Sequence, residues 1–208
     1  MVKHKPDWSL QAARRLRFIS RKAMSANSID IPVLETERLR LRPHRLADFE
    51  ASFAMWCEPE VVRHISGKPS TEQAAWGRVM NYLGLWQLLG FGYWAVEEKS
   101  SGQLIGEFGF ADFKRDLQPS IRGLPELGWA LVTRAHGKGY ATEGLRAALN
   151  WGERNLKAPR TVCLIDTGNI ASFKVAAKLG FVETAQTIYG GKPIVLLSRE
   201  LARNPDRG

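Results

Sequence analysis

The sequence predicts an α/β fold of the α+β type, with a mostly antiparallel, mixed sheet of six to seven strands flanked by about four helices. Three observations lead there: an alternating strand pattern near residue 40, two strand-like runs around a tight turn at residues 100–102, and a strand, glycine loop and helix in succession after residue 126. The length of 208 residues suits one sizeable core, and the composition is that of a globular protein.

The first predicted elements are a strand and two helices. Leu39 and Leu41 alternate with arginines, as in a half-buried strand, and residues 48–58 form a helix that ends before a proline. Ser70 can cap a long second helix that Gly90 terminates. The apolar positions of this helix recur at intervals of three and four: Ala74, Trp76, Val79, Met80, Leu83 and Trp86.

The remaining elements alternate between strands and helices. Two runs that a serine–glycine turn separates indicate a hairpin, and a glycine at position 180 is expected to end the last helix. The predicted strands span residues 92–97, 104–113, 126–132, 161–166 and 194–201, and the predicted helices span residues 139–156 and 169–179.

The net charge of +9 is concentrated at the N-terminus, where residues 1–24 carry seven basic side chains against Asp7 alone. We therefore treat residues 1–28 as a basic extension and residues 29–208 as the folded domain. Three interpretations of the extension remain open: a misassigned start with the true start at Met24, a basic arm for RNA or membrane, or an organellar transit segment. The rest of the chain is close to neutral, so its partners need not be polyanions.

Cysteines and histidines give no sign of a metal site. Cys57 and Cys163 match no metal or redox spacing and are expected to be small buried thiols in the reduced state, while His4, His44 and His64 are scattered. No apolar run reaches the roughly 18 residues of a membrane helix, and no signal peptide is evident. We expect a cytoplasmic protein without a metal or a membrane partner.

The segment from Thr133 to Glu143, T-R-A-H-G-K-G-Y-A-T-E, follows a predicted strand and opens a predicted helix. Free amides and the dipole at a helix N-terminus attract anions, and Gly137 and Gly139 let a phosphate approach the backbone. The spacing is not that of a P-loop, and Thr142 stands where a dinucleotide fingerprint needs glycine. The segment therefore indicates a phosphorylated ligand of another kind.

This loop resembles the pyrophosphate loop Q/R-x-x-G-x-G/A of the GNAT N-acetyltransferases, with Arg134, Gly137 and Gly139 filling the pattern. A second block, N-I-A-S-F-K-V-A-A-K-L-G-F at residues 169–181, resembles the strand-to-helix segment that closes that fold. The resemblance covers roughly residues 33–201 and implies a GNAT fold that uses acetyl-CoA as co-substrate. L-E-T-E-R-L-R-L-R-P looks most like the branch of ribosomal-protein N-terminal alanine/serine acetyltransferases, which does not fix the substrate.

The resemblance also implies which residues contact the cofactor. Backbone groups of the strand pair with the pantetheine arm, and amides from Gly137 to Thr142 hold the pyrophosphate. The implied cofactor-binding residues are Trp129, Ala130, Leu131, Val132, Arg134, Gly137, Lys138, Gly139, Tyr140, Ala141, Thr142, Asn169 and Ser172. Strand alternation independently puts Gly128 and Ala130 on one face with Glu126, where small side chains leave room for a thin ligand.

Acetyl transfer needs a deprotonated amine, a stabilised carbonyl oxygen and a proton for the leaving thiolate. No covalent nucleophile is evident, so we expect direct attack on the thioester. Glu126 is the candidate base, through water, because its position on the strand resembles that of a glutamate that serves as base in some family members. Glu107 is the second candidate, and either could instead be a solvated or ion-paired strand residue. In many family members a tyrosine at the position of Ala176 acts as the acid that protonates coenzyme A. This chain lacks that tyrosine, so the proton must come from Ser172, Tyr140, a water or the solvent.

The sequence thus predicts an enzyme, acting as a monomer or homodimer, that moves an acetyl group from acetyl-CoA to a primary amine. The amine belongs either to a protein N-terminus or to a small molecule. Two alternatives stay open: a protein that binds RNA or the ribosome through the basic arm, and an acyl-CoA sensor without activity. Four aromatics could line an acceptor pocket or, more commonly, form core: Trp76, Trp86, Trp94 and Phe110.

Overall fold

A computed structural model describes residues 30–202, which contain one eight-stranded sheet with the strand order β1-β2-β3-β4-β5-β6-β8-β7. Neighbouring strands are antiparallel except for the β5–β6 pair. The strands are β1 (Leu34–Glu35), β2 (Leu39–Arg42), β3 (Tyr93–Glu98), β4 (Gln103–Ala111), β5 (Glu126–Leu131), β6 (Arg160–Asp166), β7 (Val182–Tyr189) and β8 (Lys192–Glu200).

The predicted mixed, mostly antiparallel sheet is confirmed, but it has eight strands rather than six or seven. The first additional strand, β1, contains two residues, too few for a periodic pattern. The second, β7, lies at the other edge of the sheet and is exposed along most of its length. Neither strand carries the apolar alternation from which a strand is recognised in sequence.

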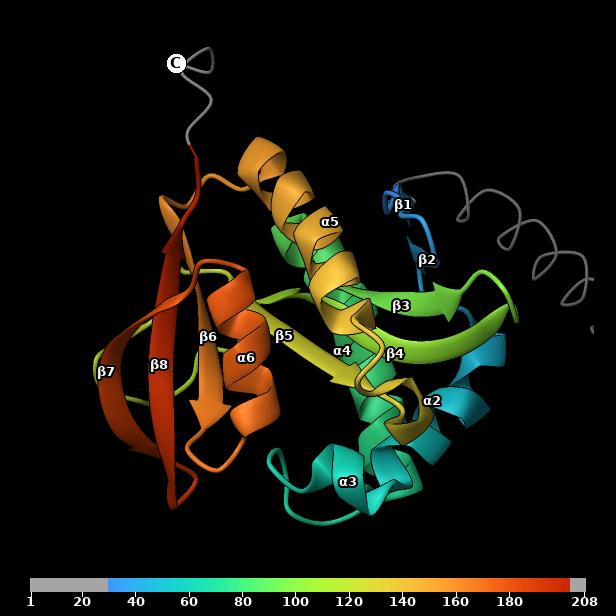
Figure 1. Cartoon of the computed structure of the whole chain (residues 1–208), viewed down its shortest axis with the longest axis horizontal. Coiled ribbons are helices and arrows are strands. Elements are labelled where there is room, and N and C mark those ends of the chain that lie inside the picture. The colour runs from blue at the N-terminus through green and yellow to red at the C-terminus, as the bar shows by residue number, and fades with distance from the viewer. Residues whose placement is uncertain (1–29, 203–208) are drawn as a thin grey trace, which may run out of the picture. The chain divides into compact units, whose positions relative to one another are not determined.

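Five α-helices flank this sheet within residues 30–202: α2 (Phe49–Cys57), α3 (Pro59–Val62), α4 (Glu72–Leu89), α5 (Tyr140–Asn155) and α6 (Ile170–Lys178). Two short 3₁₀ turns accompany them, η1 (Leu46–Asp48) and η2 (Thr133–Ala135). Figure 1 shows α5 in front of the sheet and α4 behind it. The helices therefore cover both faces.

Helix α4 corrects two details of the sequence prediction. Its N-cap is Thr71, whose hydroxyl accepts a hydrogen bond from the amide of Ala74 at 3.2 Å, and not Ser70. Its buried side chains are Ala75, Val79, Tyr82, Leu85 and Trp86, whereas Trp76 and Met80 are each 41% exposed. Of the six apolar positions recognised from the repeat of three and four, only Val79 and Trp86 are buried, so the buried face of the helix is rotated from the expected one.

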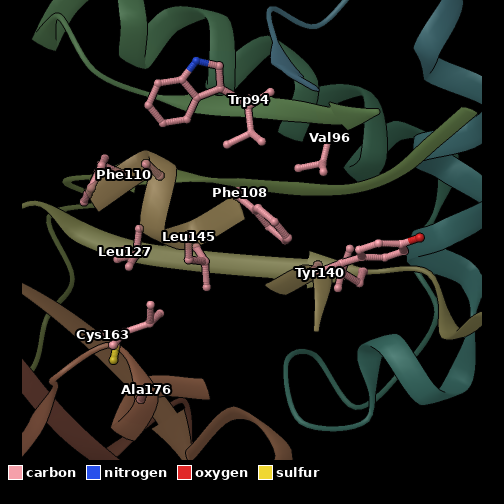
Figure 2. Packing of buried hydrophobic residues seen from close by; sticks show 14 of the residues in the cluster. Trp94, Val96, Phe108, Phe110, Leu127, Tyr140, Leu145, Cys163 and Ala176 are labelled. Atoms are coloured by element: carbon pink, nitrogen blue, oxygen red, sulfur yellow. The ribbon is translucent and has the colours of Figure 1, made fainter. Parts of the chain in front are cut away.

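The core lies mainly between the sheet and α5. Figure 2 shows Phe108, Phe110 and Leu127 of the sheet gathered against Leu145 of α5. A Cβ atom at Gly144 would lie 2.6 Å from the Phe108 ring, so only glycine lets α5 approach this closely. Of the four aromatics considered above, three are core residues with at most 2% exposure: Trp86, Trp94 and Phe110. The close fit of α5 fixes where its N-terminus lies.

Strands β5 and β6 pair at one point and then separate. Their register consists of Glu126 opposite Val162, and just before it the carbonyl of Pro125 accepts hydrogen bonds from the Val162 amide and the Thr161 hydroxyl at 3.1 and 2.7 Å. Figure 1 shows the two strands diverging from there. The separation leaves an edge of β5 available in the middle of the sheet.

The interpretations of residues 1–28 lie outside the described residues. Within residues 30–202, no helix has the length and hydrophobicity needed to cross a membrane. Both cysteines are free thiols: Cys163 is buried as expected, whereas Cys57 is only half-buried.

Candidate active site

The glycine loop presents free amides at the N-terminus of α5. The first hydrogen bond of that helix runs from the Glu143 amide to the Gly139 carbonyl at 3.1 Å, so the amides of Tyr140, Ala141 and Thr142 have no partner within the helix. Gly137 and Gly139 have positive φ angles of 73° and 81°, a region that favours glycine. The loop therefore has a backbone geometry that suits an anion.

Interactions with distant residues hold this loop in place. Arg38 bonds the Lys138 carbonyl at 3.0 Å and the Glu143 carboxylate at 2.7 Å, and its guanidinium lies 4.6 Å from the Tyr140 ring centre. On the other side of the loop, the Thr133 amide donates to Glu58 at 2.7 Å. The backbone amides are thus oriented before any ligand arrives.

The edge of β5 that faces β6 carries free peptide groups. The Val132 amide bonds the carbonyl of Ile105 at 2.9 Å, in continuation of the β4–β5 ladder. Because alternate residues of an antiparallel strand bond to the same neighbour, Trp129 and Leu131 direct their peptide groups the other way. In agreement, His136 Nε2 lies 2.9 Å from the Leu131 carbonyl oxygen. The amide of Val132 is therefore already bonded and cannot pair with a cofactor, contrary to expectation.

Two cavities meet at this edge. The larger, about 570 Å³, is bounded by the glycine loop, the start of α5, β5, α3 and α6. The smaller, about 190 Å³, extends from β5 toward β4 and α4. Their common wall consists of His64, Ile65, Trp129, Ala130, Asn169 and Ser172.

Ten of the thirteen residues assigned to cofactor binding line the larger cavity: Trp129, Ala130, Leu131, Gly137, Gly139, Tyr140, Ala141, Thr142, Asn169 and Ser172. Three do not: Val132, Arg134 and Lys138. Arg134 donates to Gln103 at 2.8 Å on the exposed surface. Asn169 also caps α6 by accepting the Ser172 amide at 3.0 Å. The structure thus brings together most of a set that is spread over 44 positions of sequence.

Both candidate carboxylates line the smaller cavity, and both are buried, which excludes the solvated interpretation. Glu126 is ion-paired: Arg115 donates from Nε to Oε2 at 2.6 Å and from Nη2 to Oε1 at 2.8 Å. Arg115 follows β4 in the chain and also lies 4.8 Å from the ring centre of Tyr189. The guanidinium therefore occupies both oxygens of the first candidate base.

Glu107 has no solvent exposure. Its oxygens accept hydrogen bonds from the Ser52 hydroxyl at 2.5 Å and the Trp56 indole at 2.9 Å, and His44 Nε2 lies 3.6 Å away. Burial alone would raise the pKa of Glu107, but the neighbouring imidazole and the two hydrogen bonds outweigh it and lower that pKa below its usual range. Glu107 is thus a buried anion of low basicity.

Gly128 and Ala130 both line the smaller cavity with Glu126, but the space directly over the Gly128 Cα atom is filled by a side chain. A Cβ atom there would lie 1.9 Å from the hydroxyl oxygen of Tyr93, which stacks on Tyr82 with ring centres 4.4 Å apart. Glycine at position 128 therefore accommodates a phenol from β3. Sequence alternation identified the small residue but could not identify its neighbour on another strand.

The candidate acids differ in their environments. The Tyr140 hydroxyl donates to Glu98 at 2.7 Å, and this bond raises the pKa of Tyr140. Ser172 lies in the wall between the two cavities. Ala176, at the position of the missing tyrosine, is fully buried in the core. Only Ser172 is thus placed between the two cavities.

Sequence reasoning missed several residues of this region. His64 Nδ1 lies 3.2 Å from Asp166 Oδ1, and when the ring nitrogen donates to the carboxylate, the lone pair of Nε2 is left free in the wall of both cavities. Arg78 and Arg115 line the smaller cavity. His64 and Asp166 are separated by 102 positions, and no motif of the sequence links them.

Comparison with known proteins identifies relatives over most of the chain. A family model described as acetyltransferase (GNAT) domain matches residues 38–182. The uncharacterized protein YkkB of Bacillus subtilis strain 168 is 30% identical over 172 residues, which cover 80% of this chain and 95% of that protein.

Solved structures share the fold. An acetyltransferase from Agrobacterium tumefaciens strain C58 is 27% identical, with a TM-score of 0.70 and coverage of 84% of this chain and 98% of that one. The ribosomal L7/L12 α-N-protein acetyltransferase RimL, solved in complex with coenzyme A, has a TM-score of 0.67 at 16% identity and coverage of 82% and 98%. This last similarity concerns the fold alone.

Proposed function

The chain belongs to the GNAT acetyltransferase family and is an acetyl-CoA-dependent acetyltransferase, and we propose that it passes the acetyl group directly to a primary amine held in the smaller cavity. The observation that carries this proposal is the meeting of the two cavities at Trp129 and Ala130. A cofactor arm in one cavity and an amine in the other would approach each other there.

The larger cavity suits the pantetheine and pyrophosphate of acetyl-CoA. The peptide groups of Trp129 and the amide of Leu131 can bond the amides of pantetheine as a further strand would, whereas the Leu131 carbonyl already lies within hydrogen-bond distance of His136 Nε2. The amides between Gly137 and Thr142, at the positive end of the α5 dipole, can hold the pyrophosphate. The thioester would then lie near Ser172, where the two cavities meet.

Direct transfer agrees with the environments of the thiols. Burial raises the pKa of the Cys163 thiol, and neither Cys163 nor Cys57 lines a cavity described above. In the proposed step the amine nitrogen attacks the thioester carbon and the C–S bond breaks. The bound ammonium first gives one proton to the base, which makes the nitrogen a nucleophile. The nitrogen loses its second proton as the amide forms, and the coenzyme A thiolate gains one.

Proton transfer is assigned to Glu126 and Ser172. A carboxylate with a lowered pKa is a weak base, which makes Glu107 the poorer proton acceptor and suits it to attract the ammonium form. Glu126 can still accept a proton through water, because each carboxylate oxygen has two lone pairs. Ser172 can donate a proton to the thiolate, whereas the Tyr140 hydroxyl already donates its hydrogen bond to Glu98.

Two measurements test this proposal. Calorimetry should detect acetyl-CoA binding, and a thiol-release assay with a panel of amines and peptides should detect turnover. Binding without turnover of any amine would favour the sensor alternative. Failure to bind acetyl-CoA at millimolar concentration would contradict the assigned cofactor cavity.

A further inference from the structure

We propose that the acceptor is a small amine that also carries an anionic group, and that Arg78 of α4 binds this group. The inference rests on the proposed function, because it concerns the same smaller cavity. It begins from an arginine that lines this cavity and for which no hydrogen bond or ion pair is found within residues 30–202.

Arg78 is held in position but not neutralised. Its guanidinium carbon lies 3.7 Å from the ring centre of Trp56, and its Nε is buried without a hydrogen-bond partner. Trp56 in turn donates to Glu107, so the ring beneath the guanidinium is itself fixed. Buried donors without partners are rare in native proteins, and one beside a cavity suggests that a ligand completes it.

The other charged groups of the cavity are already engaged. Glu126 occupies Arg115 with two hydrogen bonds, and Glu107 accepts from Ser52 and Trp56. Arg78 is therefore the arginine without a paired carboxylate among the described lining residues of this cavity. A planar guanidinium matches the geometry of a carboxylate or phosphonate, and stacking on an aromatic ring keeps its plane oriented.

The cofactor does not account for Arg78. The phosphates of acetyl-CoA are assigned to the amides between Gly137 and Thr142, which line the larger cavity. Arg78 lines the smaller cavity and not the larger one. The acceptor is the remaining molecule of the reaction. Its ammonium group would face the carboxylates of Glu107 and Glu126, and its anionic group would face Arg78.

The size of the cavity favours a small acceptor. Its volume of about 190 Å³ lies below the roughly 300–1,000 Å³ of sites for drug-sized ligands. Tyr82 and Tyr93 form an aromatic part of the wall. An amino acid or an amine of similar size with a carboxylate fits this description better than an extended peptide.

The test compares amino acids with the amines that result from removing their carboxylate, for example serine with ethanolamine. The full chain is assayed for thiol release with saturating acetyl-CoA. We expect a higher kcat/KM for the carboxylate-bearing member of each pair. Arg78→Met, which keeps an apolar side chain over Trp56, should lower that kcat/KM about 10- to 100-fold and leave the decarboxylated member nearly unchanged.

Two controls separate specificity from folding. Arg122→Met removes an exposed arginine outside both cavities and should leave both substrates unchanged. Arg78→Lys retains the charge without the planar fork and should give an intermediate loss. Equal losses for both members of a pair in Arg78→Met would indicate a structural role and overturn the inference.

Preference for the decarboxylated amines, or turnover of peptide N-termini with none of small amines, would also overturn it while leaving the proposed acetyl transfer intact. A chain that binds no acetyl-CoA would instead contradict the proposed function itself. The two failures are therefore distinguished by the calorimetric measurement of cofactor binding.

Discussion

Arg115 and Glu126 form a two-point ion pair, with donor–acceptor distances of 2.6 and 2.8 Å, in the wall of the cavity assigned to the acceptor. The pair joins a residue that follows β4 to the first residue of β5. It orients the carboxylate and compensates its charge at the same time. Any role of Glu126 in proton transfer must operate with this guanidinium in place.

We predict that Glu126→Gln lowers kcat about 100-fold or more and leaves the affinity for acetyl-CoA unchanged, because an amide cannot take up the proton of the amine. The measurement is kcat/KM as a function of pH. An unchanged profile would reject Glu126 as the base. His64→Gln belongs in the same series, since a larger loss there would move the assignment to the His64–Asp166 pair.

Ser172→Ala is expected to lower kcat about 10- to 100-fold, because the thiolate then draws its proton from solvent. Tyr140→Phe should change kcat by less than about threefold, since its hydroxyl is engaged with Glu98. Steady-state assays with one amine at saturating acetyl-CoA measure both. The reverse order of effects would transfer the acid role to Tyr140.

A matched pair of glycines tests the cofactor loop. Gly137 and Gly190 both have positive φ angles and open space where a Cβ atom would lie, so valine strains the backbone similarly at either site. Only Gly137 lines the larger cavity. Calorimetry should show that Gly137→Val weakens acetyl-CoA binding more than tenfold and that Gly190→Val does not. Equal affinities would mean that the ligand lies elsewhere.

A second pair of glycines tests the packing of α5. Gly144→Ala should destabilise the fold by about 1–3 kcal/mol, because its Cβ would meet the Phe108 ring at 2.6 Å. Gly77→Ala in α4 meets nothing within 4 Å and should stabilise by about 0.5–1 kcal/mol through helix propensity. Chemical denaturation measures both. A neutral Gly144→Ala would show that α5 shifts easily on the sheet.

The buried ion pair between Arg42 and Asp48 makes stability depend on pH. Burial alone would raise the pKa of Asp48, but hydrogen bonds from Arg42 and from the Arg45 amide lower it below its usual 3.8. A carboxylate whose pKa is lower in the folded state than in the unfolded state stabilises the fold at pH values above its unfolded-state pKa. This stabilisation is lost as the pH falls through its folded-state pKa.

Asp48→Asn should therefore cost about 2–4 kcal/mol at neutral pH, because the buried Arg42 guanidinium loses one of its two carboxylate partners and keeps only Glu97. The difference from the parent chain should shrink below about pH 4, as the parent loses its charge at this position. Urea unfolding at several pH values measures it. A difference independent of pH would mean that packing, and not charge, stabilises this contact.

Local patterns predicted most of the fold. The alternation around Leu39, the hairpin at residues 100–102 and the helices after Gly139 and Asn169 need only neighbouring residues to be recognised, and all are present. Strand β7 was missed because its side chains are mostly exposed, and the cap of α4 was shifted by one residue from Ser70 to Thr71. Two hydroxyl residues in a row are equivalent by local chemistry, so sequence could not choose between them.

By itself the sequence determined the loop between β5 and α5, because an anion site at a helix N-terminus depends on consecutive amides and glycines. Only the tertiary structure decided the surroundings of the candidate carboxylates: Arg115 at Glu126, Ser52 and Trp56 at Glu107, and Tyr93 in the space beside Gly128. It also brought Arg78 into the smaller cavity. Charge and space at a site depend on side chains from separate elements, whose approach is decided by packing across the whole sheet and not by spacing along the chain.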